Sequence, residues 1–192
     1  MESLDAYLDS LASKAAVPGG GSAAALTGAL AAALVAMVGR IGAAPGDLVS
    51  EADSLRGKLV EARSRDEDAY AAVVAAQALP KGNDAESSAR RRALDEALER
   101  AAQVPLEAAE FSLQVLRLAN RLARTPKRAL ASDVGSAAEL AHAALAACGY
   151  NVRVNHRYMR EGPIVREQTA RLVRYEGEAS QILARVRGAL SL

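Results

Sequence analysis

Residues 15–40 read AAVPGGGSAAALTGALAAALVAMVGR, and this stretch decides the fold. Three glycines open it, and no charged residue occurs from Gly19 to Val38. The run allows three interpretations: a membrane span, a phosphate-binding loop, or the buried helix of a helical bundle. Its length satisfies the rule of about 20 residues for a membrane span, but most of its residues are Ala, Gly, Ser or Thr, which gain little from lipid. A GxxxxGK[ST] phosphate loop needs a lysine, and none follows these glycines.

The third interpretation explains more of the residues. Small side chains at every fourth position line one stripe of a helix and let neighbouring backbones approach closely: Ala24, Gly28, Ala32 and Ala36. Larger apolar side chains cover the other faces, so we expect this helix in the middle of a bundle: Leu26, Leu30, Leu34, Met37 and Val38. Pro18, Gly19, Gly20 and Gly21 form the turn that enters the helix, and Ser22 is the expected N-cap.

The composition indicates an all-α protein. Hydrophobic residues make up 51% of the 192 residues while aromatic residues make up 3%, so alanine and leucine dominate. These two residues favour helices, and the usual strand formers are scarce. The length fits a single domain over residues 1–192. We therefore expect a multihelical bundle around a central Ala/Gly-rich helix.

Charge and cysteine content exclude several classes. The formal net charge of +1 gives no electrostatic footprint for nucleic acid. The single cysteine, Cys148, lies in an alanine-rich stretch and is expected to be a buried thiol. Acidic residues at the N-terminus replace the basic segment of a secretory signal, so a cytoplasmic protein is expected.

A second helix is predicted over residues 47–79, where apolar residues follow one another at spacings of three and four until Pro80 and Gly82. Asp66 interrupts this apolar stripe. One interpretation is a surface aspartate at a bend, because a carboxylate is rarely buried alone. The other is a carboxyl group held inside the bundle, with a pKa raised by desolvation and a proton to transfer.

Three further helical segments follow. One covers residues 84–124, with a bend expected at Pro105. The next begins near Ser132 or Asp133, where Asp133 could be only a cap or could carry chemistry. The segment NVRVN favours helix over an isolated strand, and a helix places Asn151 and Asn155 on one face. A last helix begins near Pro163.

The candidate chemistry is proton transfer on a small molecule. Two histidines, one cysteine and no HExxH or paired-cysteine spacing predict no metal site. No GxSxG nucleophile elbow is present either. What remains is a glycine-rich helix N-terminus, two carboxylates and two amides, a set suited to acid/base work on a polar, anionic molecule.

Five segments, in order, resemble the cyclodeaminase/cyclohydrolase family, which includes the C-terminal domain of formiminotransferase-cyclodeaminase and bacterial methenyltetrahydrofolate cyclohydrolases. They are PGGGSAAALTGALAAALVAMV, RDEDAYAAVVAAQALPK, AAQVPLEAAE, ASDVGSAAELAHAAL and NVRVN, and together they extend from about residue 4 to residue 160. The resemblance implies an all-helical homodimer that binds a tetrahydrofolate derivative in a crevice at or near the subunit interface. It implies no metal and no prosthetic group.

The resemblance also assigns site residues. It selects the turn from Pro18 to Gly21, Asp66, Lys81, Asp133, and the pair Asn151 and Asn155. This chain departs from many members at Pro126 and Lys127, where they have Gly-Asn.

The reaction implied is either closure of 5-formiminotetrahydrofolate with loss of ammonia, or opening of the methenyl ring by water. We expect Asp66 and Asp133 to act as acid/base groups, and Asn151 and Asn155 to contact the pterin or an amide. The backbone amides of Gly20, Gly21 and Ser22 would hold an anionic group. The alternatives are a non-catalytic helical dimerisation or regulatory protein of the same fold, and a membrane-associated helical protein.

Overall fold

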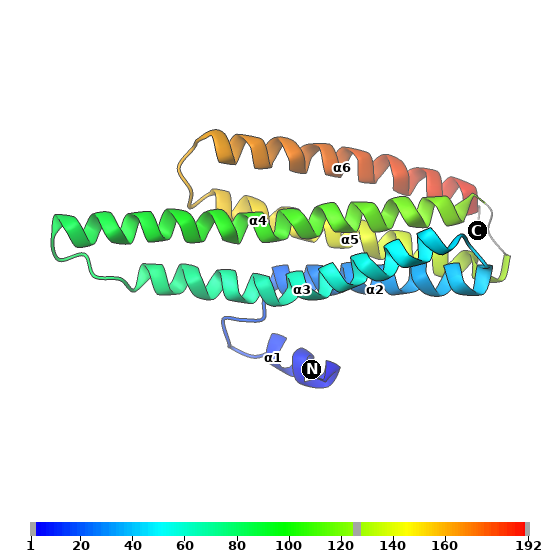
Figure 1. The fold of residues 1–192 in the computed structure, drawn as a ribbon, viewed down its shortest axis with the longest axis horizontal. Helices are drawn as coiled ribbons and strands as arrows, with labels where there is room; N and C mark the ends of the chain where they lie inside the picture. Colours follow the sequence, from blue (N-terminus) through cyan, green and yellow to red (C-terminus); the bar gives the residue numbers. More distant parts are fainter. Residues whose placement is uncertain (1–2, 125–127, 191–192) are drawn as a thin grey trace.

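The computed structural model describes residues 3–124 and 128–190 and contains helices but no strand within those ranges (Figure 1). The helices are α1 (Leu4–Leu11), α2 (Gly20–Gly42), α3 (Gly46–Gln77), α4 (Asp84–Ala123), α5 (Ala131–His156) and α6 (Pro163–Leu190). A short 3-10 turn, Arg128–Leu130, precedes α5. The all-α bundle expected from the composition is confirmed.

Helix α2 packs against α3, α5 and α4, and its small residues set how closely they approach. A Cβ atom on Gly28 would lie 2.8 Å from the Ser112 hydroxyl oxygen of α4 and 3.1 Å from a Leu59 methyl of α3. Near the other end of α2, a Cβ on Gly39 would lie 2.8 Å from Val49. The small residues therefore allow the close approach that the sequence predicts, because the neighbouring helices occupy the space that larger side chains on α2 would need.

One face of α2 stays open. Leu30 is 54% exposed, and Ala33 on the same face is exposed too. By length and composition α2 could cross a membrane, yet 61% of its most apolar window is buried inside the protein. The expectation of a helix in the middle of the bundle thus holds for three sides of α2 and not for the fourth.

Helices α3 and α4 form a long antiparallel hairpin that extends beyond the ends of the other helices, at the left of Figure 1. The outer part of the hairpin has a small core of its own, separate from the main core. This second core contains Ala69, Val73, Ala76, Ala97, Leu98, Ala101 and Val104. Helix α4 continues through Pro105 without ending there.

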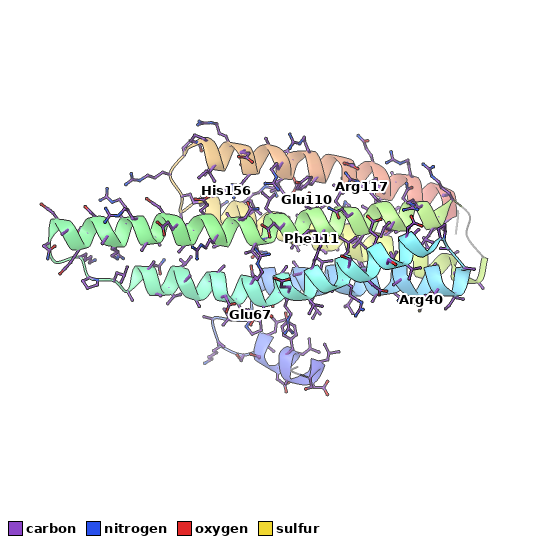
Figure 2. The ribbon with its side chains drawn as sticks, viewed as in Figure 1. Arg40, Glu67, Glu110, Phe111, Arg117 and His156 are labelled. Carbon is purple, nitrogen blue, oxygen red and sulfur yellow. The ribbon has the colours of Figure 1, made fainter. Side chains whose placement is uncertain are left out.

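Helix α6 covers α4 and α5 and is joined to both by ion pairs. Arg117 of α4 makes two hydrogen bonds to Glu178, and Arg153 of α5 makes two to Glu176. Figure 2 shows Arg117 on the side of α4 that faces α6. The side chains of these pairs are about 30–50% exposed, so each pair contributes modestly and apolar packing remains the main attachment.

Helix boundaries differ from the expectations in two places. The structure places Gly19, not Ser22, at the N-cap of α2, so the Ser22 prediction is wrong; Gly20 and Gly21, expected in the turn, are the first two residues of the helix. Helix α5 begins at Ala131 with Leu130 as its N-cap, so neither Ser132 nor Asp133 is a cap. Asp133 lies within the first helical turn, where a carboxylate still interacts favourably with the helix dipole. The helical interpretation of NVRVN is confirmed, since α5 runs to His156.

Two glycines offer a matched test of the close packing of α2. Gly57→Ala adds a methyl group in open space on α3 and is expected to stabilise the protein by about 0.5–1 kcal/mol through helix propensity. Gly28→Ala makes the same change but pushes against Ser112 and Leu59, so it is expected to destabilise by roughly 1–3 kcal/mol. Urea denaturation measures both free energies of unfolding. Equal effects of the two substitutions would contradict the close contact at Gly28.

Candidate active site

The side chain of Asp66 in α3 lies directly against the N-terminus of α2. A Cβ atom built on Gly21 would lie 2.2 Å from Asp66 Oδ1 and 2.5 Å from its Cγ, so only glycine leaves room for the carboxyl group. The backbone N–H of Ser22 donates a hydrogen bond to this carboxyl. Because Gly19 provides no side-chain cap, Asp66 satisfies one of the free amides at the start of α2 from a different helix.

The environment of Asp66 changes its acidity. Burial raises the pKa of the carboxyl above its ordinary value of 3.8, the Ser22 hydrogen bond opposes this, and the neighbouring Glu67 charge raises the pKa further. The thiol of Cys148 is fully buried in α5, and desolvation, with the Asp66 charge as a second cause, raises its pKa to about 12. Asp66 is therefore a carboxyl group that keeps its proton to higher pH than an exposed aspartate does.

Two asparagines of α5 face the same place. A Cβ atom on Gly20 would lie 3.6 Å from both terminal side-chain atoms of Asn151, whose Nδ2 donates to the Ala147 carbonyl at 2.9 Å. The Nδ2 of Asn155 donates to the carbonyl oxygens of Ala101, at 2.6 Å, and Asn151, at 3.0 Å. These bonds fix the orientation of both amides, so Asn151 and Asn155 present fixed polar groups to a ligand.

These residues line one cavity of about 430 Å³, together with Gly19, Gly20 and Gly21. That volume is within the usual range for small-molecule sites. Its remaining walls are mainly apolar: Ala16 and Val17 come from the chain before α2, and α3, α4 and α5 contribute Val73, Val74, Leu98, Ala101 and Val154. Tyr70 and Tyr158 also line it and are 46% and 71% exposed. The cavity thus combines one carboxyl group, two amides and a helix N-terminus with surfaces suited to a flat ring.

Some predicted residues lie elsewhere. Pro18 and Ser22 do not line the cavity, although Ser22 holds Asp66 through its backbone. Lys81 is exposed in the turn between α3 and α4. Asp133 and Asn151 are 18 positions apart on α5, which corresponds to about 27 Å along the helix axis. One chain therefore does not bring Asp133 to the cavity that contains Asp66.

Pro126 and Lys127, where the chain departs from the family pattern, lie outside the described residues. Within the described ranges, no group of three or more His, Cys, Asp or Glu side chains is placed to hold a metal ion.

Sequence reasoning missed the polar contacts behind Asp66. The Ser22 hydroxyl donates to Glu67 Oε1 at 2.8 Å and lies 3.0 Å from the Tyr7 hydroxyl of α1. Helix α1 itself was not expected, although Leu4, Tyr7, Leu8 and Leu11 follow a helical spacing after the N-cap Ser3. That periodicity could have revealed the helix, but nothing local to Tyr7 signals its contact with Ser22.

Comparison with known proteins gives consistent matches over most of this chain. The model of the formiminotransferase-cyclodeaminase family matches residues 3–174. A methenyltetrahydrofolate cyclohydrolase of Methylorubrum extorquens is 34% identical over 96% of this chain and 94% of its own length. A formimidoyltransferase-cyclodeaminase of Rattus norvegicus is 31% identical over 98% of this chain, which corresponds to 37% of the rat protein.

The fold has a counterpart among solved structures. The crystal structure of formiminotetrahydrofolate cyclodeaminase from Thermotoga maritima matches with a TM-score of 0.87 and 26% identity, over 99% of this chain and 96% of that one. The family match and the relative in Methylorubrum extorquens both cover most of the chain, in agreement with the family resemblance of the sequence. The chain belongs to the formiminotransferase-cyclodeaminase family.

Proposed function

We propose that this protein is a one-carbon folate enzyme that acts on the carbon bridging N5 and N10 of tetrahydrofolate, as a formiminotetrahydrofolate cyclodeaminase or a methenyltetrahydrofolate cyclohydrolase. The observation that carries the proposal is the partly buried Asp66 carboxyl with its raised pKa, set against Gly21 in a cavity of ligand size. The names of the relatives support the substrate class.

A single carboxyl group can serve either reaction. In the water reaction, Asp66 accepts a proton from water as the oxygen attacks the methenyl carbon, then donates it to N5 as the carbon–N5 bond breaks; the carbinol hydroxyl loses its proton to solvent and becomes the formyl oxygen. In the deamination, N10 attacks the carbon of the protonated formimino group and gives its proton to Asp66, which passes it to the resulting amino group as the carbon–nitrogen bond breaks and ammonia leaves. Both routes need a group whose pKa lies closer to neutrality than that of an exposed aspartate.

The remaining residues of the cavity bind and orient the substrate. Asn151 and Asn155 would contact the polar edge of the pterin or an amide of the substrate. Tyr70, Tyr158 and the apolar walls suit the faces of its rings. Because the Ser22 amide already binds Asp66, an anionic part of the substrate would meet the backbone at Gly20 and Gly21 instead. We propose that the reaction uses neither metal nor prosthetic group.

We also propose that the protein is a homodimer, as the family resemblance implies. The open face of α2 supports this, because it presents Leu30 and Ala33 within a run free of charged residues. A two-fold axis would place this face against its copy. Asp133 could join the reaction of Asp66 only from a second copy, so its acid/base assignment rests on such an assembly.

We further propose a cytoplasmic location. The largely buried α2 supports it, because a helix whose apolar window is 61% buried in the protein has little surface left for lipid.

The first test is turnover. Asp66→Asn is expected to lower kcat by about a hundredfold or more on whichever folate is the substrate, since the amide cannot transfer the proton. Methenyl- and formimino-tetrahydrofolate are assayed side by side by absorbance. Asp68→Asn is the matched control, because Asp68 is exposed on the same helix and does not line the cavity.

The outcomes of this assay decide whether Asp66 takes part in the reaction, whether the protein is an enzyme, and which of the two reactions it performs. Full activity of Asp66→Asn removes Asp66 from the mechanism. If the unaltered protein turns over neither folate and calorimetry shows no binding of tetrahydrofolate, the non-catalytic alternative is correct. Release of ammonia from the formimino substrate identifies the deaminase.

A second test uses stability. Since burial raises the native pKa of Asp66, ionising it costs free energy, and the protein loses stability as the pH rises from the ordinary value of 3.8 through the raised one. Asp66→Asn should therefore be more stable than the unaltered protein at pH 7, and the difference should disappear near pH 3. Thermal unfolding across this range measures it. A variant less stable at pH 7 would mean that the charged cap on α2 outweighs the cost of burial.

The assembly is tested by sedimentation. Leu30→Glu is expected to halve the sedimenting mass, because it places a charge on the face proposed to meet its copy. Val173→Glu provides the control, since Val173 is 58% exposed on α6, on the other side of α4 and α5 (Figure 1). A dimer that persists in Leu30→Glu, or an unaltered protein that sediments as a monomer, would refute this interface.

A further inference from the structure

Helix α1 is attached to the bundle mainly through one side chain. It has eight residues, and an isolated helix of that length is not stable in water. Tyr7 is its one buried residue, at 2% exposure, whereas Leu4 and Leu8 are 63% and 49% exposed. In Figure 1, α1 stands clear of the other helices. The position of α1 therefore depends on how Tyr7 is bound.

Tyr7 is bound on both its ring and its hydroxyl. The guanidinium of Arg63 in α3 lies 4.9 Å from the centre of the ring, which is the geometry of a cation–π contact. The hydroxyl lies 3.0 Å from Ser22 Oγ, and both residues are buried. A phenylalanine at position 7 could keep the cation–π contact with Arg63 but not the hydrogen bond to Ser22.

The hydrogen bonds through Ser22 have one direction. The Ser22 hydroxyl has a single proton, which it donates to the Glu67 carboxylate at 2.8 Å. The Tyr7 hydroxyl must therefore donate to Ser22 Oγ. Figure 2 shows Glu67 on the side of α3 that faces α1. Ser22 thus holds two consecutive carboxyl groups, Asp66 through its backbone N–H and Glu67 through its hydroxyl.

The chain between α1 and α2 forms part of the cavity wall. Ala16 and Val17 of this linker line the cavity beside the glycines. The linker is anchored at one end by α2 and at the other by α1. If Tyr7 detaches, one end of this wall loses its anchor.

We propose that Tyr7 is a positioning residue for this site: it fastens α1 and residues 12–19, which form part of the cavity wall, and, through Ser22, it holds the Glu67 side chain beside Asp66. The proposal concerns the same cavity as the proposed function and rests on it for its catalytic meaning. Two groups then act on the charge of Asp66, namely Glu67 on its own helix and the Ser22 amide from α2, while the buried thiol of Cys148 from α5 is neutral and adds no charge.

Limited proteolysis tests the attachment of the strap formed by α1 and residues 12–19. Lys14 is exposed and is the only lysine or arginine in residues 1–39, so trypsin reports on this strap through a single early cleavage. Tyr7→Phe is expected to speed cleavage after Lys14 by about tenfold, the equivalent of one buried hydrogen bond. Tyr7→Ala should speed it further, and Leu8→Ala, an exposed position on the same helix, should leave it unchanged.

Titration of Asp66 tests whether Tyr7, acting through Ser22, holds Glu67 beside Asp66. In protein labelled with ¹³C at the aspartate carboxyl carbon, the signal missing from Asp66→Asn identifies this group. Tyr7→Phe should move its titration to lower pH, because Glu67 is held less firmly beside it and repels its charge less. Glu67→Gln should move it further in the same direction, and Leu8→Ala should not move it.

Kinetics separate the two effects. Tyr7→Ala should raise KM through the loosened wall, while Tyr7→Phe and Glu67→Gln should mainly shift the pH profile of kcat. Unchanged cleavage after Lys14 in both Tyr7 variants, or an unmoved Asp66 titration in Tyr7→Phe, overturns the proposal. Proteolysis and titration do not need turnover, so they decide the role of Tyr7 even if no folate is converted and the proposed function fails.

Discussion

The carboxyl group of Asp66 occupies the space in which any side chain at position 21 would stand, and the arrangement of the cavity depends on this contact. It joins the middle of α3 to the first turn of α2, far apart in the sequence. The helix N-terminus favours a negative charge, while burial disfavours it. The two effects oppose one another in one group, and burial is the larger. A carboxyl group in that balance can gain or lose a proton at moderate cost.

The sequence predicts the helices well because their apolar residues are periodic. The start of α6 at Pro163 and the termination of α3 before Pro80 follow from residues near each boundary. Asp66 could be found because it breaks a regular stripe, and Asn151 and Asn155 because their spacing puts them on one face. In each case the signal lies within a few residues of the feature. Local patterns are therefore sufficient for these elements.

The rest depends on contacts that local patterns do not encode. Asp133 has the residue type expected of an acid/base group, but only the length of α5 shows that it lies at the other end of the bundle from Asn151. Serine is a residue type that often caps helices, yet the Ser22 hydroxyl donates to Glu67 and does not cap α2. The backbone N–H of Ser22 instead donates to Asp66. Such assignments depend on which helices are neighbours, and a single sequence does not contain that information explicitly.

The projecting α3–α4 hairpin bears on how a ligand could reach the interior. Val73 and Leu98 belong both to the walls of the cavity and to the small hairpin core, whereas Gly21 and Asn151 belong to the main bundle. Regions with few buried contacts open locally at lower free energy than the centre of a protein. The hairpin side of the cavity can therefore open locally while the contact between Gly21 and Asp66 stays rigid, so entry and release of a bulky molecule need not disturb the Asp66 carboxyl group.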